Sequence, residues 1–167
     1  MADGQPHDYE LLSTEEVYRG RIISLRKDTV AMPGGGESVR EVVHHPGAVG
    51  VVAIDDDDRV VMLRQYRHPV GEHLWELPAG LRDVDAEPPV ETARRELAEE
   101  VQLAADRPDG FVVEHEELDM TVERVPLADA VQWVFDGTVR NSLAIIGLLA
   151  AAQVRATSPR LRPLDAS

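Results

Sequence analysis

The order of hydrophobic and polar residues predicts strands in the first half of the chain and helices in the second half. Residues 21–31 and 37–45 favour strands, and the turn-forming segment MPGGGE joins them. Residues 48–54, AVGVVAI, are apolar on both faces, as expected for a buried central strand. Residues 59–66, RVVMLRQY, predict the next strand, and HLWELPAG predicts a short strand that leads into a loop.

Three helices follow from the apolar spacing and from signals at the helix ends. The first begins near Pro88, because proline suits a first helical turn, and runs to about Leu103. The second covers residues 127–135. The third runs from Asn141, whose side chain suits an N-cap, to about residue 154.

The chain of 167 residues is long enough for one hydrophobic core, and we divide it into four parts. A loose tail is expected at residues 1–15, and an N-terminal strand region at 16–47. The main domain is expected at residues 48–155, followed by a loose tail at 156–167.

The composition narrows the possible partners and the compartment. With 31 acidic and 17 basic residues, the net charge of −14 repels nucleic acid and anionic membranes, so we expect neither as a partner. An anionic substrate would need a cation or local arginines to bind. The chain has no cysteine and begins with a polar, acidic segment unlike a signal peptide, which fits a cytoplasmic protein.

The first predicted helix carries a cluster of carboxylates beside its apolar face. At 100° per residue, Glu100 lies about 40° from Glu96 on one side and Glu99 about 60° on the other. One interpretation is a solvated, salt-bridged helix face. The other is a divalent-metal site, because Mg²⁺ prefers oxygen ligands and binds through a few carboxylates plus substrate phosphates.

A set of residues at fixed spacing favours the metal site. These residues reproduce the Nudix box, with apolar residues in its apolar places: Gly80, Glu87, Arg95, Glu96, Glu99 and Glu100. The chain therefore resembles the Nudix hydrolases. It departs from the box twice, because one extra residue separates Gly80 from Glu87 and because Gln102 replaces the final glycine.

The resemblance extends beyond the box to the bacterial ADP-ribose pyrophosphatases of this family. It is carried by VREVVHHPGAVGVVAI, RQYRHPVGEHLWELPAG, EHEELDMTVERVPLADAV and NSLAIIGLLAA. It implies an α/β fold, a Nudix-like α/β/α sandwich with a mixed β-sheet between helices, preceded by an N-terminal β-hairpin region. It also implies a homodimer that uses Mg²⁺, or alternatively Mn²⁺, to hydrolyse ADP-ribose to AMP and ribose 5-phosphate.

The resemblance also implies roles for individual residues. The metal ligands would be the backbone carbonyl of Ala79 and the side chains of Glu96, Glu99 and Glu100. The catalytic carboxylates would be Glu99 and Glu100, with Glu116 and Glu117 as candidates for the base that takes the proton of the attacking water. Arg67 would contact the diphosphate, and Arg40 and Glu41 would approach the adenosine end from the partner subunit.

Two questions stay open at this point. The substrate can be another nucleoside diphosphate, such as an ADP-sugar or FAD, or the chain can be a Nudix module that binds ADP-ribose without cleaving it. In addition, the family has two strands and a loop after the box, which need on the order of 15 residues or more. Here AADRPDGF runs almost directly into the acidic EHEELDM. The segment is either omitted from the printed sequence or lost from the protein, and we favour omission because its loss would leave strand edges unpaired.

Overall fold

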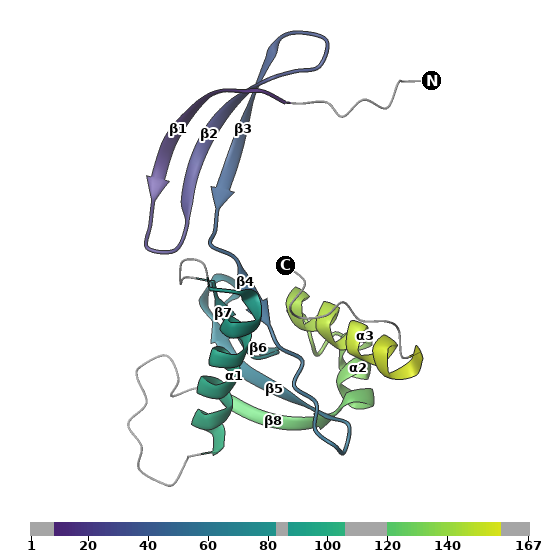
Figure 1. Ribbon diagram of the computed structural model, residues 1–167. Helices are drawn as coiled ribbons and strands as arrows, with labels where there is room; N and C mark the ends of the chain where they lie inside the picture. The colour runs from purple at the N-terminus through teal and green to yellow at the C-terminus, as the bar shows by residue number, and fades with distance from the viewer. Residues whose placement is uncertain (1–8, 83–86, 106–119, 158–167) are drawn as a thin grey trace. The chain divides into compact units, whose positions relative to one another are not determined.

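The computed structural model describes residues 9–82, 87–105 and 120–157, with no side chains described for residues 99–105. The chain divides into two compact units, residues 1–47 and 48–167 (Figure 1). We describe each unit by itself.

The N-terminal unit is a three-stranded antiparallel sheet in the order β1-β2-β3. Its strands are β1 (Leu11–Arg19), β2 (Ser24–Ala31) and β3 (Glu37–His44). The predicted turn between β2 and β3 is confirmed, and Gly34, Gly35 and Gly36 all have φ values near +90° that favour glycine. β1 begins within the segment expected to be a loose tail. All nine of its residues are exposed. Its sequence, LLSTEEVYR, does not alternate apolar and polar residues, so no such pattern marks it as a strand.

The second unit has a two-stranded sheet, a three-stranded sheet and three α-helices. The strands pair as β4-β7 and as β6-β5-β8, and every described pair is antiparallel. Their bounds are β4 (Ala48–Gly50), β5 (Arg59–Arg67), β6 (Glu72–Glu76), β7 (Ala79–Leu81) and β8 (Thr121–Pro126), with a short 3-10 helix η1 (His68–Val70). The helices are α1 (Pro89–Ala105), α2 (Leu127–Phe135) and α3 (Ser142–Thr157). Most strands precede the three α-helices in the chain, as expected, and the combination of sheets with helices confirms the predicted α/β class.

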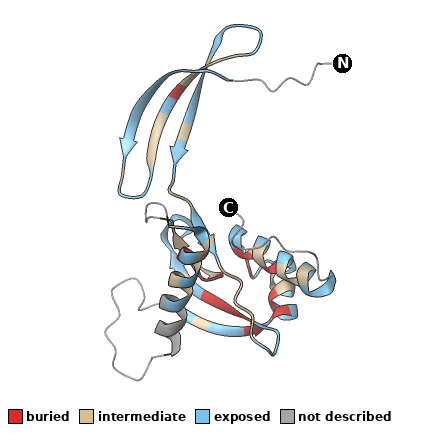
Figure 2. Cartoon of the chain, in the orientation of Figure 1, coloured by how far each residue is buried: buried red, intermediate tan, exposed pale blue. Residues whose placement is uncertain are grey.

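The strand with the most buried residues is β5 rather than the predicted central strand at residues 48–54. In that segment only β4 is a strand, it pairs with β7 alone, and no residue from 48 to 54 is buried. In contrast, β5 has a partner on each side and its residues 60–63 are all buried (Figure 2). Apolar composition alone does not distinguish the two segments, because burial depends on which strands pair with each of them.

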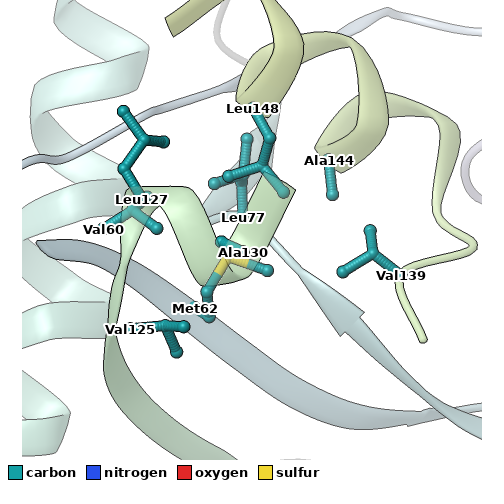
Figure 3. Close-up of a cluster of buried hydrophobic side chains, with 9 residues drawn as sticks. All are labelled: Val60, Met62, Leu77, Val125, Leu127, Ala130, Val139, Ala144 and Leu148. Carbon is teal, nitrogen blue, oxygen red and sulfur yellow. The ribbon is translucent and has the colours of Figure 1, made fainter. Parts of the chain in front are cut away.

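The core of this unit joins β5 and β8 to α2 and α3 (Figure 3). Its buried cluster comprises Val60, Met62, Leu77, Val125, Leu127, Ala130, Val139, Ala144 and Leu148. A Cβ atom on Gly147 would lie 2.5 Å from Cδ1 of Leu77, so α3 packs closely on the segment that leads into β7. The predicted cap of α3 is confirmed, because the Ala144 amide donates to Oδ1 of Asn141 at 3.0 Å. Among the described helices, none is long and apolar enough to cross a membrane.

Candidate active site

The carboxyl group of Glu96 lies directly over the backbone of Gly80. Gly80 is in β7 and Glu96 is in α1, and these two elements contact each other. A Cβ atom on Gly80 would lie 1.8 Å from Cδ and 2.2 Å from Oε1 of Glu96, far inside van der Waals contact. The glycine that opens the acidic segment therefore provides the space that the Glu96 carboxylate occupies.

Arg95 bonds two carboxylates and fixes them relative to α1. Its Nη1 donates to Oε1 of Glu96 at 2.7 Å, and its Nη2 donates to Oε2 of Glu87 at 3.2 Å. The Oγ1 hydroxyl of the fully buried Thr92 donates to the same Glu87 oxygen at 2.7 Å. The hydrogen bonds from Arg95 and then Thr92 lower the pKa of Glu87, and the bond to Glu87 is the main reason that the pKa of Arg95 is raised. These contacts hold Glu87 and Arg95 in their charged forms, and Arg95 orients Glu96.

The donors around Gly80 fit a hard divalent cation. Carboxylate and carbonyl oxygens are the ligands that Mg²⁺ prefers. Glu96 lies against Gly80, and the residue before it in β7, Ala79, has a backbone carbonyl. Among the side chains that the structure describes, no three acidic or histidine residues are grouped closely enough to hold a metal. Glu99 and Glu100 lie in α1, but their side chains are outside the described part of the structure.

Arg67 makes a two-point ion pair with Glu76 instead of standing alone at the end of its strand. Its Nε donates to Oε1 at 2.9 Å and its Nη2 to Oε2 at 2.5 Å. The amide of Gln65 donates to the same carboxylate at 3.3 Å. The Glu76 side chain is 4% exposed and that of Arg67 is 45% exposed, so a buried carboxylate holds a half-exposed guanidinium.

The remaining predicted site residues belong to the N-terminal unit or fall outside the described residues. Arg40 and Glu41 are adjacent in β3, so their side chains point to opposite faces of the N-terminal sheet. Arg40 donates to the carbonyl oxygen of Val39 at 3.0 Å. The two candidates for the general base, Glu116 and Glu117, are outside the described residues.

The sequence prediction missed Glu76 and Thr92. Both are polar residues in apolar surroundings, Glu76 within LWELP and Thr92 on the buried side of α1. A buried carboxylate requires a partner, and the neighbouring strand offers Arg67, so the charge within an apolar run was the available signal. Thr92 gave no such signal, because an isolated threonine is common in helices.

Comparisons with known proteins agree with this geometry. Residues 44–120 match the family described as NUDIX domain, and residues 9–43 match the nucleoside diphosphate sugar hydrolase N-terminal domain. The chain is 45% identical to an ADP-ribose pyrophosphatase of Mycobacterium tuberculosis, over 95% of this chain and 90% of that protein. It is 38% identical to an ADP-ribose pyrophosphatase of Bacillus subtilis, over 58% of this chain and 51% of that protein. A crystal structure of an ADP compounds hydrolase has the same fold, with a TM-score of 0.74 and 21% identity over 95% of this chain and 100% of that chain.

The mycobacterial protein is longer within the aligned region. The alignment spans 187 residues, whereas 95% of the 167 residues here is about 159, so about 28 residues of that relative have no counterpart. This difference is large enough for the strand pair and loop that the family is expected to have after the box.

Proposed function

This chain belongs to the Nudix hydrolase family, and on that basis we propose that it hydrolyses the pyrophosphate bond of ADP-ribose to AMP and ribose 5-phosphate. The observation that carries the proposal is the placement of the Glu96 carboxylate over Gly80, held by Arg95. The 45% identity to an ADP-ribose pyrophosphatase over almost the whole chain supports the substrate. A cytoplasmic location fits the absence of cysteine.

In this proposal Mg²⁺ is held by the side chains of Glu96, Glu99 and Glu100 and by the carbonyl of Ala79. When bound, the ion neutralises the diphosphate and lowers the pKa of a water molecule. Arg67 binds the diphosphate through its guanidinium, which suits phosphate oxygens. Glu116 or Glu117 takes the proton of the attacking water, as a carboxylate can do when placed within hydrogen-bond reach.

We also propose a homodimer formed through the N-terminal sheet. Leu25 in β2 has Tyr18 of β1 and Val43 of β3 as its cross-strand partners, so three apolar side chains form a row on one face. Tyr18 is 57% exposed and Val43 is 61% exposed, which leaves this face available to a second copy. Arg40 and Glu41 would reach the adenosine end of the substrate in the partner subunit.

The test is hydrolysis of ADP-ribose, followed by chromatography of AMP, with Mg²⁺ and with excess EDTA. We expect AMP only with Mg²⁺, and a loss of turnover by orders of magnitude in Glu99→Gln and Glu100→Gln. Glu91→Gln is the matched control, because Glu91 is on the same helix but bonds Arg94 at 2.6 Å on an exposed face. Binding of ADP-ribose without any AMP would overturn hydrolysis in favour of a binding module.

A further inference from the structure

Arg67 does not pair with the carboxylate that lies directly opposite it. In the β5-β6 pairing Arg67 is opposite Glu72, whereas Glu76 is opposite Leu63. Direct cross-strand partners have Cβ atoms about 5 Å apart, so Glu72 is the nearer carboxylate by register. Arg67 instead bonds Glu76, whose register position is four residues back along β5, or about 13 Å at ~3.3 Å per residue. The Arg67 side chain therefore extends back along the sheet.

A second arginine explains why Glu72 does not hold Arg67. Arg140 lies in the segment between α2 and α3, far from β6 in the sequence, and it donates a hydrogen bond to Glu72. The hydrogen bond from Arg140 also lowers the pKa of Glu72, so this carboxylate stays charged and paired. The two arginines are thus assigned to two carboxylates at opposite ends of β6, Arg140 to Glu72 and Arg67 to Glu76.

Glu76 is well suited to fix the direction of a guanidinium. Its carboxylate is buried, it accepts from both Nε and Nη2 of Arg67, and Gln65 donates to it from the same face of β5. A two-point contact of this kind sets the plane of the guanidinium as well as its position. Arginine has five N–H groups in a fixed fork, so one edge can bind a carboxylate while another binds a phosphate oxygen.

The direction of Arg67 matters because Glu76 ends β6 next to the candidate active site. Only Leu77 and Pro78 separate Glu76 from Ala79 and Gly80 in β7. Arg67 lies at the turn of the β5-β6 hairpin, and Glu76 lies at the end of β6 that leads to β7. The Glu76 carboxylate therefore holds the guanidinium on the side of the hairpin that leads to the strand in contact with Glu96.

We propose that Glu76 is a positioning residue that orients Arg67 toward the diphosphate of the substrate. The inference rests on the proposed function, in which Arg67 binds that diphosphate. Without the Glu76 charge, the guanidinium loses the two charged hydrogen bonds that set its plane and direction. Substrate binding then requires Arg67 to be ordered again, at a cost that appears mainly in KM.

The experiment is a double-mutant cycle on kcat/KM for ADP-ribose, with Glu76→Gln, Arg67→Ala and the double variant. We expect Glu76→Gln to lower kcat/KM about tenfold, mostly through KM, in the otherwise unchanged protein. In the Arg67→Ala background the same substitution should change kcat/KM less than twofold, because Glu76 acts only through Arg67. Glu72→Gln is the matched control on the same strand, and it should leave kcat/KM within twofold.

Each other outcome has a definite meaning. Equal losses from Glu76→Gln in the presence and absence of Arg67 indicate a purely structural role and overturn the positioning proposal. An unchanged kcat/KM in Arg67→Ala overturns the role of Arg67 and of Glu76 while hydrolysis itself stands. No hydrolysis by the wild-type protein overturns the proposed function and this inference with it. If Glu76→Gln fails to fold in a thermal melt, Glu76→Asp keeps the charge with a shorter reach and takes its place in the cycle.

Discussion

Glu96 occupies the position that a Cβ atom of Gly80 would take. All three atoms nearest to that position, within 2.2 Å, belong to the end of the Glu96 side chain. The backbone of Gly80 does not have the positive φ that would restrict the position to glycine. An added methyl group therefore conflicts with a movable side chain and not with the fold.

We accordingly expect Gly80→Ala to displace Glu96 while the protein stays folded. The melting temperature should change by only about 2–4 °C, as for a loss near 1 kcal/mol, whereas the Mg²⁺ concentration for half-maximal activity should rise about tenfold or more. Metal titrations of activity, with thermal melts in EDTA, measure both quantities. Glu96→Gln should have little further effect in the Gly80→Ala background. Unchanged metal dependence would show that the Glu96 position is unimportant for metal binding.

The charge of Glu87 should make stability depend on pH in the acid range. Because Arg95 and Thr92 lower the pKa of Glu87 below its ordinary 4.5, the folded state favours the charged form. The resulting stabilisation is fully present above pH 4.5 and is lost as the pH falls through the lowered pKa of the folded state.

Glu87→Gln tests this dependence by removing the titrating group. In EDTA, the variant should melt below the wild type at pH 7, and the difference should shrink as the pH falls below 4.5. Thermal melts by circular dichroism at several pH values measure it. A difference that is constant down to pH 3 would mean that the Glu87 charge contributes nothing to stability.

The Nudix box and the helix ends could be predicted from sequence because they depend on residues close together in the chain. The spacing from Glu87 to Glu100 and the cap at Asn141 are local signals, and the bounds predicted for α2 agree with the structure. The burial of β5 instead of residues 48–54 could not be predicted, because it depends on strand pairing. β8 was also missed, since its two valines at 122 and 125 do not alternate with a period of two.

The pairing of Arg67 with Glu76 shows the same limit within the site. Both residues stand in RQYRHPVGEHLWELPAG, a segment that carries the family resemblance, but only Arg67 was predicted to contact the substrate. Which carboxylate Arg67 bonds depends on the register of β5 against β6 and on the position of Arg140, which comes from a distant part of the chain. Neither the strand register nor the position of Arg140 can be predicted from the spacing of residues in the sequence.

The cap of α3 offers a stability test away from the site. Asn141 accepts the Ala144 amide through its side chain, so Asn141→Ala should cost about 1 kcal/mol in the free energy of unfolding. Asn141→Asp keeps an acceptor and should lose less. Ser142→Ala changes the next residue, which is exposed, and serves as the control. Urea denaturation gives the three values, and equal effects of Asn141→Ala and Ser142→Ala would contradict the capping role.

Neighbouring leucines in α3 should differ sharply in their contribution to stability. Leu148 is fully buried in the core beside Leu77, whereas Leu149 is 38% exposed. Truncating a fully buried leucine removes its transfer free energy and leaves a cavity, so Leu148→Ala should cost about 2–5 kcal/mol. Leu149→Ala should cost under about 1 kcal/mol, because much of that side chain already contacts water.

Because Leu77 precedes the strand that holds Gly80, the cavity should also loosen the backbone beside Glu96. We therefore expect Leu148→Ala to lower kcat/KM several-fold at temperatures where it is still folded, and Leu149→Ala to leave it unchanged. Urea denaturation and kinetics on the same preparations measure both effects. If both variants lost the same stability, α3 would not be packed against the segment before β7 as described. If Leu148→Ala lost stability but kept full activity, the position of Gly80 would be set by β4 and α1 alone.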